Sequence, residues 1–286
     1  MALAPMNYRH AYHAGNFADV LKHSALVAIL LHLRKKEKPF AVIDTHAGRG
    51  LYDIGGGEAK KAGEAGDGVL RLLPLENLPG VLAPYCDIVR GFGDSVYPGS
   101  PLIAAKLLRA KDRLIAVEKQ PQEYAALAAA LSCEKGARAV KEDGYSELAS
   151  LVPPPERRGL VLIDPPYETE DEFPRATRAI VEAYRRFATG IFLFWYPAKI
   201  RPAVAASIGE FLTAGISSLL KIEFDTGASR LPKEPGRGEP MTATGLLVIN
   251  SPFGFAEEMR AILPFLTQIL AQGPDAHGAV EILAQR

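Results

Sequence analysis

The sequence is poor in cysteine and in long apolar runs, and each shortage excludes a class of protein. Among 286 residues there are two cysteines, Cys86 and Cys133, which lie far apart and outside any CxxC or Cys/His ligand pattern. Neither a disulfide scaffold nor a structural zinc site is therefore expected. The longest uninterrupted apolar run, residues 25–31, is far shorter than the roughly 18 residues that a membrane-spanning helix needs.

The sequence also lacks a net charge and a recognisable leader. The 33 basic and 33 acidic side chains cancel, so a uniformly basic surface that coats nucleic acid is not expected, and a polyanion would have to be bound locally. The first ten residues show no charged segment followed by an apolar one, as a secretory signal would. We therefore expect a cytoplasmic protein that does not contact a membrane.

Short apolar runs alternate with helical patterns, which predicts an α/β fold with a seven-stranded, mostly parallel sheet. The runs are Phe40–Thr45, Arg113–Glu118, Ala137–Asp143, Gly159–Asp164, Gly190–Tyr196, Leu219–Asp225 and Thr244–Asn250. Helices are expected at Asn16–Arg34, Ser100–Arg109, Pro121–Ser132, Phe173–Phe187 and Ala256–Gln272. The connection between the last two runs has no helical period, so these two strands are expected to be antiparallel.

One connection is too long for a simple strand-helix-strand unit. The first strand ends at Asp44 and the second at Glu118, 74 positions later, whereas such a unit needs about 30 residues. We therefore expect a single domain over residues 1–286 that carries an inserted helical subdomain at residues 51–99. Residues 1–15 precede the expected N-cap, Asn16, and are interpreted as a loop on the substrate side.

The strongest motif is Asp-Pro-Pro-Tyr at residues 164–167, directly after a buried apolar run. The carboxyl ends of parallel strands are where open α/β sheets bind ligands. An adenine amino nitrogen is a poor nucleophile, and Asp164 together with the Pro165 carbonyl could accept hydrogen bonds from it. The ring of Tyr167 offers a stacking face for a base taken out of its helix. The alternative is a simple turn with a solvent-facing tyrosine.

A second motif, Asp-Thr-His-Ala-Gly-Arg-Gly at residues 44–50, follows the first expected strand. It is neither a dinucleotide fingerprint nor a P-loop, because the third glycine position is Asp53 and no Gly-Lys-Ser/Thr follows. Glu118 suits a ribose diol, and Asp143 with Gly144 suits an adenine edge. Each acid alone is more often a cap or turn residue, but acids at successive strand ends together indicate an adenosine pocket beside a nucleophile site.

Five of the six histidines lie near the N-terminus, at positions 10, 13, 23, 32 and 46. Their spacing does not favour a metal site, which would need closed ligand spacing and supporting acids. Hydrogen bonding and aromatic contact are the preferred interpretation, with His32 as a surface residue. No metal cofactor is expected.

Seven sequence strings together resemble the bacterial 23S ribosomal RNA adenine N6-methyltransferase family of the RlmJ type, and the resemblance runs from about Met6 to the C-terminus. They are Tyr-Arg-His (8–10), His-Ala-Gly-Asn-Phe-Ala-Asp-Val-Leu-Lys-His (13–23), Asp-Thr-His-Ala-Gly-Arg-Gly (44–50), Tyr-Pro-Gly-Ser-Pro (97–101), Asp-Pro-Pro-Tyr-Glu (164–168), Trp-Tyr-Pro (195–197) and Met-Thr-Ala-Thr-Gly (241–245). Asp-Pro-Pro-Tyr alone is shared by many amino-methyltransferases.

This resemblance implies a Rossmann-like class I methyltransferase that uses S-adenosylmethionine and releases S-adenosylhomocysteine. The residues that would contact the cofactor are His23, His46, Ser100, Glu118, Asp143, Gly144 and Asp164. The catalytic set is Asp164 as proton acceptor, with Pro165 and Tyr167, and Tyr8 would contact the target RNA. Arg49 stands where relatives carry a small residue, which leaves the packing of its loop open.

The expected partner is 23S rRNA, either naked or in an early assembly intermediate, bound by a monomer. Residues 1–40 carry six basic and two acidic side chains, a net of +4, so we expect a basic N-terminal edge that meets RNA at one rim. An enzyme acting on DNA adenine or processing external DNA remains an alternative, as does a noncatalytic nucleic-acid-binding module on the same fold. A guanine- or glutamine-directed enzyme is less favoured, because glutamine-directed relatives tend to carry Asn at position 164.

Overall fold

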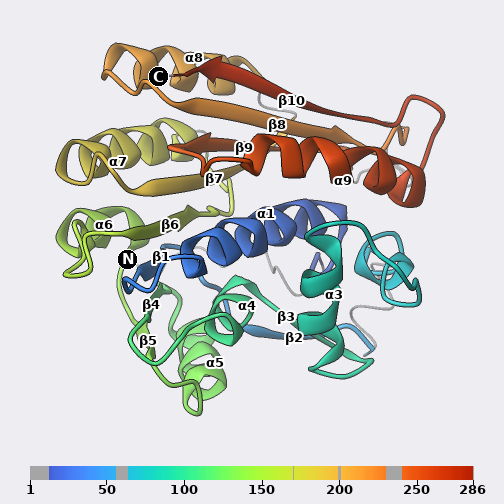
Figure 1. Cartoon of the computed structure of the whole chain (residues 1–286), viewed down its shortest axis with the longest axis horizontal. Coiled ribbons are helices and arrows are strands. Elements are labelled where there is room, and N and C mark those ends of the chain that lie inside the picture. Colours follow the sequence, from blue (N-terminus) through green and yellow to red (C-terminus); the bar gives the residue numbers. More distant parts are fainter. Residues whose placement is uncertain (1–12, 56–63, 170, 199–200, 230–239, 286) are drawn as a thin grey trace.

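The chain is built around one eight-stranded sheet with helices on both faces (Figure 1). The computed structural model describes residues 13–55, 64–169, 171–198, 201–229 and 240–285. The sheet order is β10-β8-β9-β7-β6-β1-β4-β5. Its strands are β1 (Ala41–Asp44), β4 (Arg113–Val117), β5 (Ala137–Val140), β6 (Gly159–Ile163), β7 (Ile191–Pro197), β8 (Leu219–Asp225), β9 (Ala243–Ile249) and β10 (His277–Ala284).

Five neighbouring strands, β7 to β5 in the sheet order, are parallel, as the sequence predicts, and the others form an antiparallel edge. β1 pairs with both β4 and β6 in parallel, whereas β9 runs antiparallel to β7 and to β8. The expected antiparallel pairing of the last two apolar runs is confirmed. The prediction of seven strands is wrong by one, because β10 joins the edge next to β8. None of the residues in β10 is buried, so an edge strand of this kind leaves no apolar run to detect.

Helices cover both faces of the sheet and create two hydrophobic cores. The helices are α1 (Phe17–Arg34), α3 (Leu82–Arg90), α4 (Ser100–Lys106), α5 (Pro121–Leu131), α6 (Gly144–Leu151), α7 (Glu172–Arg186), α8 (Arg201–Thr213) and α9 (Phe255–Leu270). The core under α1, α3, α4, α5 and α9 takes Leu193 and Trp195 from β7, and the core under α6, α7 and α8 takes Phe192 and Phe194. This alternation follows from the two-residue period of a strand buried on both faces.

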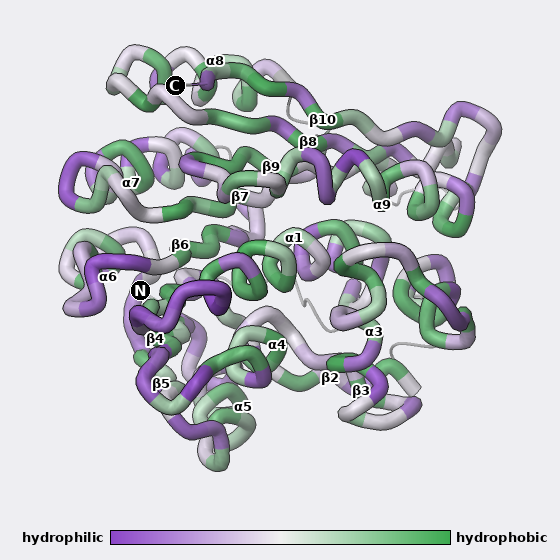
Figure 2. The backbone as a smooth tube through the Cα atoms, in the orientation of Figure 1, coloured by the Kyte–Doolittle hydropathy of each residue, from purple (hydrophilic) through white to green (hydrophobic). Residues whose placement is uncertain are grey.

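All five expected helices are present, and their ends differ from the predicted ones by at most three residues. Helices α6 and α8 are additional. Figure 2 shows hydrophobic residues along the central strands, with hydrophilic residues on many connections. No helix in the described part of the chain is long and apolar enough to span a membrane.

The connection over residues 51–99 holds more than helices. Its described part contains β2 (Leu51–Asp53) paired with β3 (Val96–Pro98), the 3-10 turn η2 (Val69–Arg71) and α3. Tyr85 and Tyr97 from this segment are fully buried in the same core as α1. The segment is therefore joined to the main body by apolar packing.

Helix α1 packs along the sheet and is almost entirely buried. It begins where the Asn16 side chain accepts hydrogen bonds from the amides of Ala18 and Asp19. Polar side chains near its start are buried as well, including Asp19 (2% exposed) and Lys22 (3% exposed). Its 18 residues give it a length of about 27 Å. Arg34, Lys35, Lys36 and Lys38 therefore lie far from Lys22, and the basic residues of the described part of this segment do not form a single rim.

Candidate active site

Acidic side chains gather at the carboxyl ends of neighbouring parallel strands. Asp44 is the last residue of β1, while Glu118 and Asp164 directly follow β4 and β6, the two neighbours of β1. Asp143 follows the next strand, β5, and caps α6. The predicted juxtaposition of strand-end acids is thus present, because neighbouring parallel strands end at the same edge of the sheet.

A buried lysine from α1 meets this acidic edge. The Lys22 ammonium contacts Asp164 Oδ2 and lies 2.8 Å from Asp19 Oδ1. It also lies 5.7 Å from the centroid of the Trp195 ring, within the range of a cation–π contact. Burial by itself would lower the pKa of Lys22, but the charges of Asp164 and Asp19 outweigh it and raise the pKa above its ordinary value. Lys22 is therefore a buried ammonium whose charge compensates two carboxylates.

Sequence reasoning missed Lys22 as a site residue. The signal was present, because Lys22 stands three positions after Asp19 within an expected helix that is otherwise largely apolar. Lys22 and Asp164 are 142 positions apart, however, and no local pattern joins them.

Tyr167 is held inside a ring cluster rather than on an open turn. Its backbone is left-handed (φ 53°), a conformation that costs a bulky residue energy and needs support from its surroundings. The hydroxyl donates a hydrogen bond to the Trp195 carbonyl at 2.6 Å. Its ring stacks on Phe173, with centroids 5.7 Å apart, and lies 5.6 Å from Trp195. The alternative of a solvent-facing tyrosine is therefore wrong.

Two of the sequence motifs that carry the family resemblance, residues 195–197 and 241–245, contact each other next to this cluster. The indole nitrogen of Trp195 donates to Thr244 Oγ1 at 2.7 Å. A Cβ atom at Gly245 would lie 2.2 Å from the Tyr196 ring, so the neighbouring strand must carry a glycine at that position. Trp-Tyr-Pro and Met-Thr-Ala-Thr-Gly are thus packing partners across β7 and β9 that support Tyr167.

Asp44 is the most buried acid of the group. It is 1% exposed and accepts a hydrogen bond from Ser100 Oγ at 2.6 Å. Burial raises the pKa of Asp44 to about 7, although the bond from Ser100 acts in the opposite direction. Ser100 reaches Asp44 because the amide of Gly99 donates to the Gly50 carbonyl at 2.8 Å, which ties the start of α4 to the loop after β1.

We expect Asp44→Asn to flatten the dependence of stability on pH. Since folding raises the pKa of this acid, the folded state loses stability as pH rises from the ordinary value of 3.8 to about 7. The amide that replaces the carboxyl group in the variant does not titrate. Thermal unfolding at pH 5 and pH 8 should show a smaller drop in Tm for the variant than for the wild type. An equal drop in Tm for the variant and the wild type would show that folding does not change the pKa of Asp44.

Glu118 holds the loop after β1 while keeping acceptor capacity. Its two carboxylate oxygens accept the amides of Gly48, at 2.9 Å, and Gln120, at 2.7 Å. A carboxylate has about four acceptor positions, so Glu118 keeps acceptor capacity for a hydroxyl of a diol. Gly48 has a φ of +60°, and a Cβ atom there would lie 2.3 Å from the Tyr52 hydroxyl. The backbone turn beside Glu118 therefore requires glycine.

Asp143 is already engaged by the protein. Its Oδ1 accepts the amides of Tyr145 and Ser146 as the N-cap of α6, and its Oδ2 receives Lys119 at 2.8 Å and Arg175 at 2.9 Å. Burial favours a raised pKa, but the bonds from Lys119 and Arg175 prevail and lower the pKa of Asp143 to about 2. A ligand that uses Oδ2 must displace an exposed ion pair, which is a small cost.

His46 lies just after the carboxyl end of β1, and Gly144 lies in the segment after the carboxyl end of β5. A Cβ atom at Gly144 would lie 1.9 Å from the Thr45 carbonyl oxygen, so only glycine allows this approach. The ring of His46 makes an edge contact with Tyr145, with centroids 4.7 Å apart, and Nδ1 lies 2.8 Å from Thr45 Oγ1. Burial lowers the pKa of His46 to about 4, so the imidazole is neutral at pH 7.

His23 is buried against Tyr97. It is 1% exposed, and its Nδ1 lies 2.6 Å from the Tyr97 hydroxyl, which in turn lies 2.9 Å from the Tyr85 hydroxyl. In this conformation His23 offers no surface to a ligand and instead supports Tyr97, three positions before Ser100. The preferred interpretation of the histidines as hydrogen-bonding and aromatic residues fits His23 and His46.

Other site predictions fall outside this cluster. Tyr8, and with it most of the loop over residues 1–15, lies outside the described residues. Within the described ranges, no group of three or more His, Cys, Asp or Glu residues is arranged to hold a metal ion. The open question of Arg49 is answered by an ion pair, in which its Nε and Nη2 donate to the two oxygens of Glu123 on α5, both at 2.9 Å.

The fold and the site define a class of protein. A parallel sheet whose reversed strand β9 lies between β7 and β8, with acids at the carboxyl ends of β1, β4, β5 and β6, is that of a Rossmann-like class I S-adenosylmethionine-dependent methyltransferase. The chain belongs to the family described as "Ribosomal RNA large subunit methyltransferase D, RlmJ", whose profile matches residues 37–283.

Close relatives agree with this assignment over nearly the whole chain. The chain is 40% identical to Ribosomal RNA large subunit methyltransferase J of Escherichia coli, covering 96% of this chain and 98% of the relative. It is 41% identical to the protein of the same name from Haemophilus influenzae, covering 96% of each. A crystal structure of a Legionella pneumophila protein superposes with a TM-score of 0.83 at 34% identity, covering 96% of this chain and 98% of that one.

Proposed function

We propose that the protein transfers a methyl group from S-adenosylmethionine to the N6 amino group of a specific adenine in 23S rRNA. The observation that carries this proposal is the Asp-Pro-Pro-Tyr segment at the end of β6, where Lys22 holds Asp164 and the ring cluster holds Tyr167. The family and its relatives named as rRNA methyltransferases support RNA as the substrate class. The protein acts as a cytoplasmic monomer, in one domain that carries residues 51–99 as an insertion.

The strand-end residues fit S-adenosylmethionine by their chemistry. Glu118 has acceptor capacity left for the ribose hydroxyls, and Gly144 lets the Thr45 carbonyl at the end of β1 approach the start of α6, beside Asp143. His46, Ser100 and Asp164 complete the polar lining, while His23 acts through Tyr97. The cofactor, when bound, supplies an electrophilic methyl group on a sulfonium that is already a good leaving group.

The residues of this chain position and desolvate the reactants rather than form a covalent bond with them. Lys22 occupies Oδ2 of Asp164, and no hydrogen bond from the described residues reaches Oδ1. Oδ1 and the Pro165 carbonyl accept hydrogen bonds from the adenine amino group, which directs its nitrogen lone pair. Asp164 then accepts the proton that the methylated nitrogen releases. The base contacts the outer edge of the aromatic cluster to which Tyr167 belongs.

Methyl transfer to isolated nucleic acids tests this function. With radiolabelled S-adenosylmethionine, we expect incorporation into deproteinised 23S rRNA from a strain that lacks the protein, and none into genomic DNA. Mass-spectrometric mapping should find a single N6-methyladenine. Labelling of DNA instead would favour the DNA-adenine alternative, and no labelling of either would contradict the proposal.

A further inference from the structure

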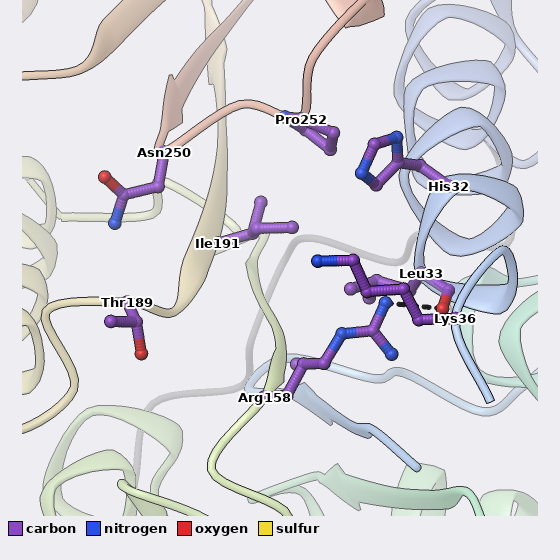
Figure 3. Close-up of a pocket in the computed structure, with 9 residues that line it drawn as sticks. His32, Leu33, Lys36, Arg158, Thr189, Ile191, Asn250 and Pro252 are labelled. Carbon is purple, nitrogen blue, oxygen red and sulfur yellow. Dashed lines mark hydrogen bonds between the residues drawn. The ribbon is translucent and has the colours of Figure 1, made fainter. Parts of the chain in front are cut away.

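A basic pocket lies at the amino ends of β6 and β7, whereas the active site lies at the carboxyl ends of the parallel strands. It has a volume of about 210 Å³ and is lined by the C-terminal end of α1, the start of β6 and the residues after β9. Figure 3 shows Lys36 and Arg158 together on one side of this pocket, with His32 and Pro252 facing each other across another. None of its nine lining residues is acidic. The pocket is therefore suited to a small anionic group.

The cations of the pocket are held in place by the fold. Arg158 donates to the Leu33 carbonyl at 2.5 Å and to the Lys38 carbonyl at 2.9 Å. These bonds satisfy one carbonyl in the last turn of α1 and one in the segment that follows it, both of which would otherwise repel an anion, and they use two of the five N–H donors of the guanidinium. In the described part of the chain no carboxylate forms an ion pair with Lys36 or Arg158. The positive charge therefore remains available to a ligand.

The titration of His32 reports the same positive environment. Burial, followed by the charges of Lys35, Arg158 and Lys36, lowers the pKa of His32. A phosphate bound in the pocket would oppose these charges and raise that pKa. His32 is thus a built-in probe of anion binding.

An exposed aromatic ring beside the pocket indicates that the ligand also carries a group that can stack on it. Phe253, next to the pocket-lining Pro252, is 96% exposed, the largest exposure of any large apolar side chain in the described residues. It belongs to the short connection between β9 and α9, whose ends are set by left-handed Asn250 and Gly254. A solvent-exposed aromatic ring beside a cationic pocket is the arrangement with which proteins bind single-stranded nucleic acid, by stacking a base and pairing a phosphate.

We propose that Phe253 and this pocket form a second RNA-binding site, in which Lys36 and Arg158 hold a phosphate while a neighbouring base stacks on Phe253. The strand β6 separates Arg158 from Asp164 by about 20 Å, so the site binds RNA distant from the target adenine. It gives a role to Lys36, one of the basic residues near the end of α1 that the active site leaves unused. The proposal rests on the proposed function in taking the RNA to be the substrate.

The test compares RNA binding by Lys36→Glu and Phe253→Ala. Fluorescence anisotropy with a labelled 23S rRNA transcript should show roughly tenfold weaker binding for Lys36→Glu and a shallower salt dependence, by about one unit of log–log slope. Phe253→Ala should weaken binding roughly fivefold or more, and Phe253→Trp should restore it. Affinity for S-adenosylhomocysteine and the kcat at saturating RNA should not change, while the KM for RNA rises.

Control variants reverse a lysine charge and truncate an exposed apolar side chain elsewhere on the surface. Lys135→Glu reverses the charge of an exposed lysine, and Leu212→Ala truncates a side chain that is 45% exposed on α8. Both should bind RNA as the wild type does. Binding by the Lys36 and Phe253 variants within twofold of these controls would overturn the proposal.

Two further outcomes separate the explanations. If inorganic phosphate raises the pKa of His32 in an NMR titration while both variants bind RNA normally, the pocket takes a free phosphate and the RNA site is wrong. Anisotropy requires no methyl transfer, so loss of binding in the variants of a protein that methylates no rRNA would leave this site standing and contradict only the proposed function.

Discussion

Asp164→Asn should reduce methyl transfer to rRNA by at least about a thousandfold while leaving the protein folded. The amide cannot accept the proton that the reaction releases, and it presents one acceptor where the carboxylate presents two oxygens. The fold should survive because Lys22 keeps its ion pair with Asp19, at 2.8 Å. Single-turnover assays with saturating rRNA measure the rate, and thermal unfolding measures the stability.

A matched control lies a few residues away. Asp171 is exposed just before α7 and caps that helix without a side-chain hydrogen bond, so Asp171→Asn should keep full activity. Asp164→Asn should also retain affinity for S-adenosylhomocysteine within a few fold, measured by calorimetry. Near-normal turnover of Asp164→Asn would contradict the role of Asp164 in catalysis.

Lys22→Met should lose both activity and stability. Removing the ammonium leaves Asp19, 2% exposed, and Asp164 without their shared cation, and an uncompensated buried charge typically costs about 3–5 kcal/mol. Activity falls because Asp164 is then free to rotate away from the substrate. Urea denaturation measures the free energy of unfolding, and rRNA methylation measures activity.

A second variant separates the structural and positioning roles of Lys22. In Lys22→Met/Asp19→Asn the buried charge of Asp19 is also removed, so we expect much of the lost stability to return. Activity should stay low, because Asp164 still has no lysine to orient it. Recovery of activity together with stability would mean that Lys22 acts only through folding.

Much of the fold could be predicted because its signals are local. The buried strands β1, β4, β6 and β7 are apolar runs that end in acids or turns, and Asn16 is a recognisable cap at the start of α1. β10 was not predicted because none of its residues is buried at the edge of the sheet, so no apolar core face marks the strand. Helix α6 escaped because eight residues after a capping acid are too few for a clear helical period.

From the residue pattern alone, site residues could be predicted only where an acid follows an apolar run that forms a strand. Asp44, Glu118, Asp143 and Asp164 each follow an apolar run, and strand adjacency brings them to one edge. Lys22 lies in a helix and not at a strand end, and its pairing with Asp164 depends on α1 passing over the end of β6. The resemblance supplied Ser100 and His46, whose places beside Asp44 and Thr45 come from chain segments that meet only in the folded sheet.

The sequence by itself determined the class of fold, the acids at the strand ends and the Asp-Pro-Pro-Tyr motif, because each depends on residues within one strand and the turn after it. Only the tertiary structure decided where the basic side chains of α1 and the residues after it lie relative to the active site. It buried Lys22 between two carboxylates and placed Lys36 beside Arg158, at the opposite ends of the strands. The physical reason is that a long helix packed along a sheet separates its own two ends by about 27 Å, while it brings Lys22 against Asp164, 142 positions away.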